Sequence, residues 1–456
     1  MPSPRMMRVN LQTLGCRLNE AELETWARQF QQLGHQITPD ETGADLVVVN
    51  TCAVTQEAVR KSRKLLRRAQ RANPRAKLVV SGCFATLEIQ ALALDAGIDL
   101  VIPNADKDRL VAITTAELDL PTMPRTALAA DANPLFARGR QRAFIKVQDG
   151  CRYRCAFCIV TLARGEERSR PIPEVIDEIN QAAAAGVREA VLAGVHLGGW
   201  GSDLGLGLDD LIGTVLAETD MPRLRLGSLE PWELPDGLWD LFANPRLMPH
   251  LHLPLQSGAD SVLRRMARRC RTDEFARLAQ EARARVPDIN LTTDIIAGFP
   301  GETEAEWRQT LDFAASIGFG QVHIFPYSPR PGTKAASLPD QVPAEVKKER
   351  SREMHELVCR MRAATFARYL GQRTSLLLEG RQGSDPDGDH QGYTPHYLPV
   401  RVRPNRGQDL TNQLPQVELT AIHPDGDSLI ATLAPQDHEG SPADEALWPL
   451  ADPAAA

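Results

Sequence analysis

Apolar runs alternate with helical patterns over the first hundred residues. Segments 19–33 and 54–72 repeat apolar positions at the spacing of a helix, and short apolar runs stand between them. The predicted strands are residues 9–14, 45–50, 78–81 and 98–102. Strands that alternate with helices of this length are typical of βαβ units with a parallel sheet. We therefore predict a Rossmann-like domain over residues 6–118.

A second series of the same kind occupies the middle of the chain. Its predicted strands are residues 144–147, 190–193, 223–226, 250–255, 290–297 and 321–326. Six strand–helix units are too few for a closed eight-fold barrel. They predict a partial, TIM-like (βα)6 barrel, open on one side, over residues 137–368. Residues 114–141 lose the pattern and contain three prolines, which indicates a linker.

The last segment has shorter strands separated by Gly, Asp and Pro. The predicted strands are residues 374–378, 398–402, 416–422 and 428–433. This pattern predicts a small antiparallel β-barrel over residues 371–436. The chain as a whole is therefore expected to be an α/β protein with three domains.

Composition and charge limit the classes of function. The chain has 456 residues, 43% hydrophobic and 24% charged, and the composition is that of a globular protein. No segment has the pattern of a signal peptide or of a membrane-spanning helix, so we expect a cytoplasmic protein with no membrane partner. A net charge of −7 argues against general coating of nucleic acid, so RNA binding would need a local basic patch.

One basic patch is present between residues 60 and 75, where no acidic residue occurs. Its members are Arg60, Lys61, Arg63, Lys64, Arg67, Arg68, Arg71 and Arg75. The run could equally be the solvated face of a helix. Arg63, Arg67 and Arg71 are our candidates for RNA contacts, together with Arg401 and Arg403 in the last domain.

The strongest local signal is a C-x3-C-x2-C motif formed by Cys151, Cys155 and Cys158. It follows the first strand of the central series, at the end of the strand where barrel enzymes build active sites. Three thiolates on one loop can hold three irons of a cubane cluster and leave the fourth iron open. The alternative is a structural zinc site, but such a site needs a fourth ligand, and no other Cys or His lies nearby.

Three further cysteines occupy equivalent places in the first domain. Cys16, Cys52 and Cys83 each follow one of its first three strands. Ligands of open α/β sheets bind at the carboxyl ends of the strands, so these thiols should converge on one crevice. One buried cysteine is commonly structural, but three at the same topological place predict a second metal site.

Several motifs together resemble a known family. The C-x3-C-x2-C motif with an aromatic before its last cysteine resembles the radical S-adenosylmethionine superfamily. The motifs around Cys16, Cys52 and Cys83, together with residues 146–151, 226–231, 252–258 and 294–302, resemble the radical methylthiotransferases over nearly the whole chain. Within that family, residues 50–63, 228–234 and 323–333 are most similar to the MtaB branch, and the last domain resembles an RNA-binding TRAM domain.

The resemblance implies a specific chemistry. It implies two [4Fe–4S] clusters, one on each cysteine triad, and S-adenosylmethionine, which is cleaved reductively at the open iron of the Cys151–Cys158 cluster. Members of the MtaB branch methylthiolate C2 of N6-threonylcarbamoyladenosine beside the anticodon of tRNA. The expected partners are thus the tRNA anticodon arm and an electron donor such as flavodoxin or ferredoxin. The sequence departs from the family at Thr161-Leu162, where Pro-Tyr is usual, and keeps Arg164-Gly165.

Candidate residues for binding S-adenosylmethionine lie at predicted strand ends and beside the motif. They are Phe157, Gly194, Glu230, Gln256, Asp294 and Gly298. Gly194 would let the backbone approach a ligand closely, and the polar side chains offer hydrogen bonds. Each could instead have a packing or capping role.

Three other functions remain open at this point. The chain could methylthiolate isopentenyl adenosine in tRNA, or an aspartate on a ribosomal protein. It could also be an iron–sulfur RNA-binding or electron-transfer protein without catalysis. The basic run and the branch motifs favour a tRNA methylthiotransferase.

Overall fold

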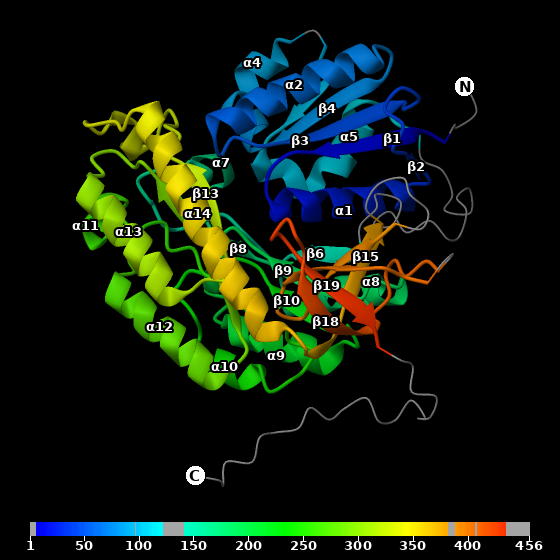
Figure 1. Cartoon of the computed structure of the whole chain (residues 1–456). Helices are drawn as coiled ribbons and strands as arrows, with labels where there is room; N and C mark the ends of the chain where they lie inside the picture. The colour runs from blue at the N-terminus through cyan, green and yellow to red at the C-terminus, as the bar shows by residue number, and fades with distance from the viewer. Residues whose placement is uncertain (1–5, 96, 122–140, 382–387, 406–407, 435–456) are drawn as a thin grey trace, which may run out of the picture.

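The structure has three parts that follow one another along the chain (Figure 1). A computed structural model describes residues 6–95, 97–121, 141–381, 388–405 and 408–434. Among these residues, no helix is both long and apolar enough to cross a membrane.

The N-terminal part is a five-stranded parallel sheet in the order β2-β1-β3-β4-β5. Its strands are β1 (Arg8–Thr13), β2 (Gln36–Ile37), β3 (Leu46–Thr51), β4 (Lys77–Gly82) and β5 (Leu100–Ile102). Its helices are α1 (Arg17–Gln32), α2 (Gln56–Ala72), α3 (Cys83–Leu87), α4 (Ile89–Ala93), η1 (Asn104–Arg109) and α5 (Leu110–Glu117). Trp26 and Phe30 of α1 pack with α5 on one face, and Leu66 of α2 packs on the other.

The predicted βαβ organisation is confirmed, with differences in detail. Strand β2 has only two residues, which is too short to give a periodic signal. The helix expected before residue 96 is two short helices, α3 and α4, which meet at Glu88. Helix α5 continues to Glu117, so the first residues of the expected linker are helical, and residues 122–140 lie outside the described residues.

The central part is the predicted open barrel. Its six parallel strands are β6 (Arg142–Lys146), β9 (Glu189–Ala193), β10 (Arg223–Leu226), β11 (His250–His252), β12 (Asn290–Ala297) and β13 (Gln321–Pro326). They form two three-stranded sheets, β6-β9-β10 and β11-β12-β13, which the parallel bridge between Ser228 and His252 connects. The surrounding helices are α7 (Val160–Arg164), α8 (Ile172–Ala184), α9 (Leu208–Glu218), α10 (Leu238–Leu241), α11 (Asp260–Arg265), α12 (Thr272–Arg285), α13 (Glu304–Ile317) and α14 (Ala344–Tyr369).

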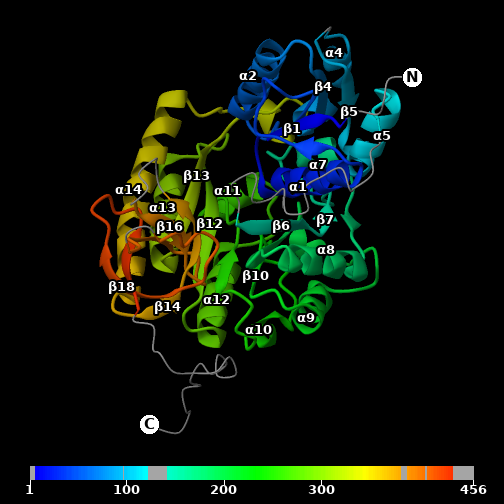
Figure 2. The ribbon, with the colours of Figure 1, turned by 90° about the vertical axis from the view of Figure 1, so that its right-hand side faces the viewer.

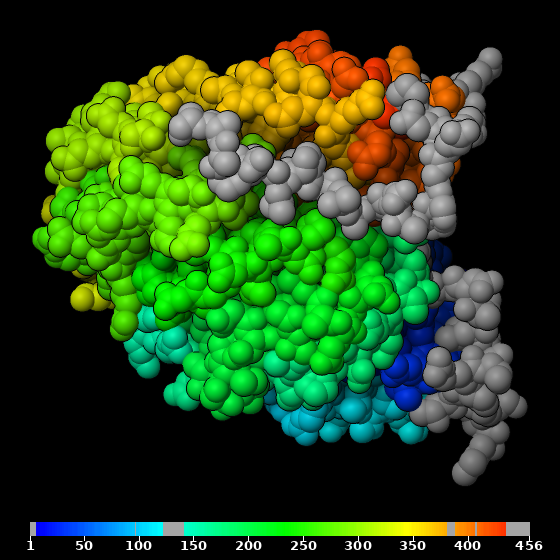
Figure 3. Space-filling view, turned by 90° about the horizontal axis from the view of Figure 1, so that it is seen from below, coloured from blue at the N-terminus to red at the C-terminus, as the bar shows by residue number. Residues whose placement is uncertain are grey.

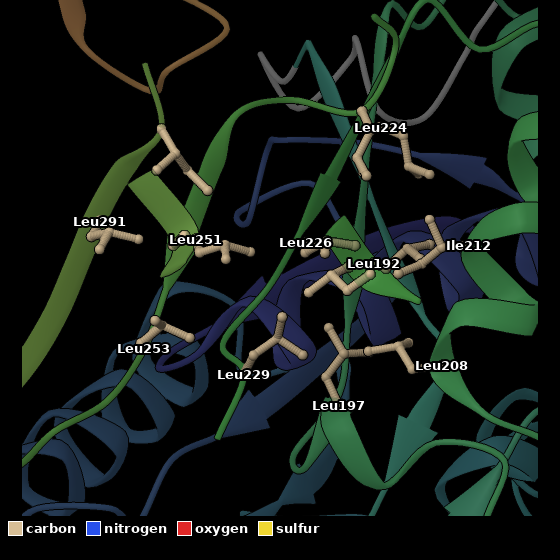
Figure 4. Packing of buried hydrophobic residues seen from close by; sticks show 14 of the residues in the cluster. Leu192, Leu197, Leu208, Ile212, Leu224, Leu226, Leu229, Leu251, Leu253 and Leu291 are labelled. Carbon is tan, nitrogen blue, oxygen red and sulfur yellow. The ribbon is translucent and has the colours of Figure 1, made fainter. Parts of the chain in front are cut away.

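Side chains alternate between the two faces of the barrel strands. The outward residues are leucines and other apolar residues that pack under the helices (Figure 4), among them Leu192, Leu226 and Leu251. Successive residues of a strand point to opposite faces, so their neighbours point into the barrel. These inward residues are largely polar: Arg142, Lys146, Glu189, Arg223, Arg225, His250, His252, Asn290, Thr292, Asp294 and His323. The interior of the barrel is therefore a charged and polar surface.

The C-terminal part is a curled six-stranded sheet in the order β14-β18-β19-β17-β16-β15. Its strands are β14 (Arg373–Ser375), β15 (Leu377–Arg381), β16 (His390–Tyr393), β17 (Pro399–Val402), β18 (Gln416–Ile422) and β19 (Leu429–Leu433). The pairs are antiparallel as expected, except that β17 and β19 are parallel. This difference arises because β19 inserts between β17 and β18 instead of adding at an edge.

The C-terminal part is docked onto the barrel through backbone carbonyls. Figure 2 shows β16 beside β12, and Figure 3 shows α14 and the C-terminal strands side by side along one edge of the green central part. Two barrel side chains donate hydrogen bonds to the turn between β16 and β17. Arg225 Nη1 donates to the carbonyl of Pro395 (2.9 Å), and Asn290 Nδ2 donates to the carbonyl of His396 (2.8 Å). Buried Glu189 holds Arg225 in place through contacts of 2.8 and 3.2 Å. This carboxylate therefore anchors the junction.

We expect Glu189→Gln to destabilise the protein by about 3–5 kcal/mol at pH 7, because it leaves buried guanidinium groups without a carboxylate. Burial alone would raise the pKa of Glu189, but Arg225, Arg142 and Arg223 lower it from 4.5 to about 2. The carboxylate thus stabilises the fold above pH 4.5, and this contribution is lost as the pH falls toward 2. The difference in the free energy of unfolding between the wild type and Glu189→Gln should therefore shrink over that range. Urea unfolding at several pH values measures this difference.

The matched control is Glu281→Gln, which changes an exposed carboxyl on α12. It should alter the free energy of unfolding by less than about 0.5 kcal/mol. Equal losses for the two variants at neutral pH would contradict the role of Glu189.

Candidate functional site

The N-terminal sheet brings Cys16, Cys52 and Cys83 to one edge. They follow β1, β3 and β4, which are neighbours in the sheet. Burial raises the pKa of Cys52 to about 11, with smaller effects of the neighbouring Cys16 and Cys83. Gly15 has a φ of 114°, and a Cβ there would lie 2.8 Å from the Cys52 Sγ. The glycine lets the Cys16 loop approach Cys52 closely.

The second triad lies on the loop that follows β7 (Gln148–Asp149), a short strand paired with β8 (Arg168–Ser169). All three of its cysteines are partly buried. Gly150, with a φ of 75°, precedes the loop, and a Cβ there would lie 1.8 Å from the Glu166 carbonyl oxygen, so a side chain is excluded. Burial raises the pKa of Cys151 to about 12 and that of Cys158 to about 11, and the neighbouring thiols add to both. Three converging thiols of this kind fit the ligand set of an iron–sulfur cluster.

Arg268 supplies positive charge at the second triad. Its side chain is only 2% exposed, its Nη1 lies 3.9 Å from the Cys155 Sγ, and its Nη2 donates to Glu230 (2.7 Å). The guanidinium also stacks over Trp232 at 4.4 Å. A buried cation beside thiolates offsets the charge of a cluster held by them. Sequence reasoning placed Glu230 near the cofactor but missed Arg268, whose one visible signal was its place in an arginine-rich run.

A second polar network lies behind Cys151. His196 is 1% exposed and contacts Glu167 with one ring nitrogen and Glu233 with the other. Glu233 also accepts from Tyr153, which lies inside the cysteine motif. Cys151, Glu167 and His196 have ligand atoms within 4.8 Å of one another. This network fixes the loop of the second triad to β9 and β10. Its members are far apart in the chain, so no local sequence pattern could have revealed it.

The other predicted cofactor residues fall into different environments. A Cβ on Gly194 would lie 3.0 Å from Gln148 Oε1, so the glycine is needed for packing there. Gln256 is 9% exposed with a φ of 76°, a left-handed conformation that is rare for this residue type and typical of functional sites. Gly298 packs against Lys347 of α14, where a Cβ would lie 2.2 Å from Cγ. Asp294 pairs with His252 inside the barrel at 3.2 Å, and Phe157 is partly buried in the cysteine loop.

Helix α7 connects the two triads. It begins two residues after Cys158 and lies between the N-terminal sheet and the barrel in Figure 1. Asn104 donates to the Ala163 carbonyl of α7 (2.7 Å) and lies 3.7 Å from the Cys83 Sγ. Arg164 donates to Asn19 (2.8 Å), whose side-chain oxygen is 3.8 Å from the Cys16 Sγ. The residues that surround one triad are thus bonded to the helix that begins at the other.

Arg164 is also the centre of a buried ion cluster. Its Nη1 contacts Glu22 of α1 at 2.9 Å and Asp149 of β7 at 3.0 Å. Lys107 of η1 contacts Glu22 at 2.5 Å, and Lys146 of β6 contacts Asp149 at 2.9 Å. Burial alone would raise the pKa of Glu22, but Arg164, Lys107 and Lys146 lower it to about 2. These five groups join the N-terminal and central parts.

Comparisons with known proteins agree with this architecture. Residues 8–103 match the uncharacterized protein family UPF0004, and residues 145–314 match the Radical SAM superfamily. The threonylcarbamoyladenosine tRNA methylthiotransferase MtaB of Thermotoga maritima is 35% identical over 82% of this chain and 87% of its own length. The chain belongs to the radical S-adenosylmethionine methylthiotransferases of the MtaB type.

Other relatives of the family carry two different names. MtaB of Bacillus subtilis is 33% identical over 87% of this chain and 90% of its own length. A tRNA-2-methylthio-N(6)-dimethylallyladenosine synthase of Geobacillus kaustophilus is also 33% identical, over 83% of this chain and 74% of its own. Among solved structures, the radical S-adenosylmethionine methyltransferase TsrM of Kitasatospora setae aligns with a TM-score of 0.55 at 17% identity, covering 73% of this chain and 77% of that one. That likeness shows the fold alone.

The Radical SAM match contains the loop of the second triad, so an iron–sulfur cluster and S-adenosylmethionine are the cofactors of this methylthiotransferase's central part. Thr161 and Leu162, which stand where the family usually has Pro-Tyr, lie beside that loop. Thr161 donates to the Tyr153 carbonyl (3.0 Å), which a proline could not do. Leu162 is 54% exposed. The substitution therefore keeps the loop restrained and presents an apolar side chain.

The arginines predicted to contact RNA differ in whether they are paired with a carboxylate of the protein. Arg63, Arg67 and Arg71 are exposed along one face of α2, and no described carboxylate is within ion-pair distance of them. Arg401 pairs with Asp427 at 2.9 Å, and Arg403 pairs with Asp389 at 2.7 Å. The charge available for phosphates is therefore concentrated on α2.

We expect Arg164→Met to lower the free energy of unfolding by about 3–5 kcal/mol, because it leaves Glu22 and Asp149 buried with fewer partners. Arg164→Lys should lose less, since one cation remains. The control is Arg168→Met, a 48% exposed arginine that approaches Asp149 only at 3.9 Å. Chemical unfolding of the three variants measures the effect, and a loss for Arg164→Met no larger than that of the control would contradict it.

Proposed function

We propose that this chain transfers a methylthio group to C2 of N6-threonylcarbamoyladenosine next to the anticodon of tRNA. The observation that carries the proposal is the arrangement of two cysteine triads, one in each of two domains, joined through Arg164 and Asn104. The names of the relatives at 33–35% identity support tRNA as the substrate.

The two triads are proposed to hold one [4Fe–4S] cluster each. When bound, the clusters and S-adenosylmethionine supply the radical chemistry and the sulfur that an unactivated C2–H requires. Arg268 offsets negative charge at Cys155, and Arg164 and Asn104 hold the surroundings of Cys16 and Cys83 against α7. Glu230 and Gln256 are the proposed contacts to S-adenosylmethionine, and an electron donor such as flavodoxin or ferredoxin completes the system.

The second candidate substrate is isopentenyl adenosine in tRNA, because relatives of equal identity carry that name. The ribosomal aspartate is not supported by the relatives reported above. A non-catalytic role is disfavoured by membership in an enzyme family.

The deciding experiment is nucleoside analysis of tRNA by mass spectrometry. The chain is expressed in a host that lacks its own methylthiotransferases but makes both precursor nucleosides. The 2-methylthio form of N6-threonylcarbamoyladenosine should appear. The corresponding isopentenyl product in its place would favour the second candidate, and the absence of both would refute tRNA methylthiolation.

The two triple Cys→Ala variants, one for each triad, should lose different activities. The reconstituted protein should contain roughly eight irons, and either triple Cys→Ala variant roughly four, on the stoichiometry of two cubane clusters. Loss of Cys151, Cys155 and Cys158 should abolish formation of 5′-deoxyadenosine from S-adenosylmethionine. Loss of Cys16, Cys52 and Cys83 should spare that cleavage and abolish the methylthio product.

Cys359→Ser is the control, because this thiol is exposed on α14. It should change neither iron content nor product. If both triple variants lose cleavage equally, or if either keeps all its iron, the assignment of two clusters with separate roles is wrong.

The basic face of α2 is proposed to contact the phosphates of the anticodon arm. Changing Arg63, Arg67 and Arg71 together to Glu should weaken tRNA binding. It should also reduce the slope of the logarithm of the binding constant against the logarithm of salt concentration, by up to roughly 0.9 for each lost phosphate contact. Cleavage of S-adenosylmethionine without tRNA should be unaffected. Binding titrations at several salt concentrations provide the measurement.

A charge-matched control changes Lys348, Arg352 and Arg360, which are exposed on α14, to Glu. It carries the same change in net charge at another place. If it weakens binding as much as the α2 variant does, the effect is one of total charge, and the α2 face has no special role.

A further inference from the structure

Three neighbouring strands place a polar cluster inside the barrel. His252 of β11, Asp294 of β12 and His323 of β13 have side-chain ligand atoms that all lie within 4.8 Å of one another. His252 Nε2 is 3.2 Å from Asp294 Oδ1, and its Nδ1 is 2.9 Å from the Thr292 hydroxyl. The rings of His252 and His323 are 5.5 Å apart. His323 is the exposed member of the cluster.

Arg17 reaches the barrel interior from the N-terminal part. It follows Cys16 directly, and its guanidinium lies over the Phe144 ring of β6 at 5.0 Å. Burial lowers the pKa of His323, with smaller lowering effects of His252 and Arg17 and an opposing effect of Asp294. The side chain is exposed, and among the described residues no carboxylate lies within ion-pair distance of it. Arg17 is thus a cation over an inward residue of β6, and no carboxylate of the described residues is paired with it.

Tyr397 completes the group from the C-terminal part. Its hydroxyl accepts from Arg17 Nη2 at 3.4 Å, and its ring lies 4.9 Å from that of His250. Its φ is 64°, a left-handed conformation that costs energy for a residue with a bulky side chain. The stack with Tyr393 at 4.8 Å and the Arg225 guanidinium at 4.8 Å hold the ring in place. Arg17 of the N-terminal part and Tyr397 of the C-terminal part therefore meet at the polar interior of the barrel, where His250 and His252 both contact the Thr292 hydroxyl.

We propose that this group is the subsite for the N6 substituent of the substrate, in which Arg17, His323 and Tyr397 bind its carboxylate. The inference rests on the proposed function and selects between its two candidate nucleosides. The threonylcarbamoyl substituent carries one carboxylate, together with N–H and hydroxyl donors. Asp294 accepts from one of these donors, and its pairing with His252 limits repulsion between the two carboxylates.

The same contacts discriminate against an isopentenyl substituent. That group is apolar and would cover Arg17 and Asp294 without offering either a hydrogen bond. A site built for hydrogen bonds rejects an analogue that lacks them, because its polar groups are then desolvated without partners. Arg17 is adjacent in sequence to Cys16. A substituent bound by Arg17 would therefore hold the attached base close to the first triad.

A divalent cation is the competing occupant of the His252, Asp294 and His323 cluster. Both ring nitrogens of His252 already have partners, in Thr292 and Asp294. The unpaired cation Arg17 beside the cluster also opposes a metal ion. These two observations favour an anionic organic group.

The test uses the cluster-reconstituted enzyme and three anticodon stem-loop RNAs. One RNA carries N6-threonylcarbamoyladenosine next to the anticodon, the second carries the methyl ester of that nucleoside, and the third carries isopentenyl adenosine. Wild-type enzyme should bind the free acid about 10- to 100-fold more tightly than the ester, as expected for charge-assisted hydrogen bonds. Arg17→Met should reduce this ratio to near 1, and Arg17→Lys should retain part of it. Fluorescence anisotropy measures the affinities.

Two further variants complete the design. His323→Phe should reduce the acid-to-ester ratio without changing iron content, and Arg277→Met, an exposed arginine on α12, should leave the ratio unchanged. A wild-type enzyme without preference for the acid, or an Arg17→Met variant that keeps the preference, would overturn the subsite. So would a non-iron metal ion that is bound by the wild type and lost in His323→Phe.

The proposed function is judged separately by the methylthio product of the wild type. If the wild type makes no product from any of the three RNAs, the proposed function fails. The acid-to-ester binding ratio still decides whether Arg17 reads a carboxylate.

Discussion

The arrangement of the whole molecule depends on the buried ion cluster around Arg164. Two acids, Glu22 and Asp149, meet three bases, Lys107, Lys146 and Arg164, and the groups come from both sides of a domain boundary. A buried charge without a partner costs several kcal/mol, so this cluster is satisfied only when the N-terminal sheet is correctly seated on the barrel. Arg164 of this cluster also donates to Asn19, whose side-chain oxygen lies 3.8 Å from the Cys16 Sγ. The cluster therefore positions the two triads and offsets part of the charge that thiolates would bring.

Much of the fold could be predicted from the sequence because it is encoded in local periodicity. Strands such as β3 and β12 are apolar and long enough to be recognised. Cys16, Cys52 and Cys83 lie at one edge of the sheet because a parallel sheet brings the carboxyl ends of its strands together. The two-residue strand β2 and the insertion of β19 between β17 and β18 have no such signal. Pairing of that kind is decided by tertiary contacts and not by the pattern within a segment.

The polar surroundings of the site could not be predicted, since they join residues that are far apart in the chain. Arg268 meets Cys155 across 113 positions, and Arg164 meets Asn19 across 145. The basic run of α2 was visible, but its partners were not: Arg68 pairs with Glu41, and Lys61 pairs with Glu57 just before the run. Only the structure shows that Arg63, Arg67 and Arg71 keep their charge available. A sequence motif can thus identify the ligands of a cofactor, but not the charges that surround it.

The surfaces near the triads are of two kinds, apolar side chains that can contact the faces of a planar base and a polar barrel interior that can contact a charged substituent. Val54, Leu162 and Phe325 are 47%, 54% and 44% exposed, and each lies close in the chain to a triad or to His323. Such surfaces favour the faces of an aromatic ring. The inner face of the barrel is instead polar, and Tyr397 of the C-terminal part lies against it. The curled C-terminal sheet is therefore more than an appended surface, because its β16–β17 turn forms part of the wall of the barrel interior.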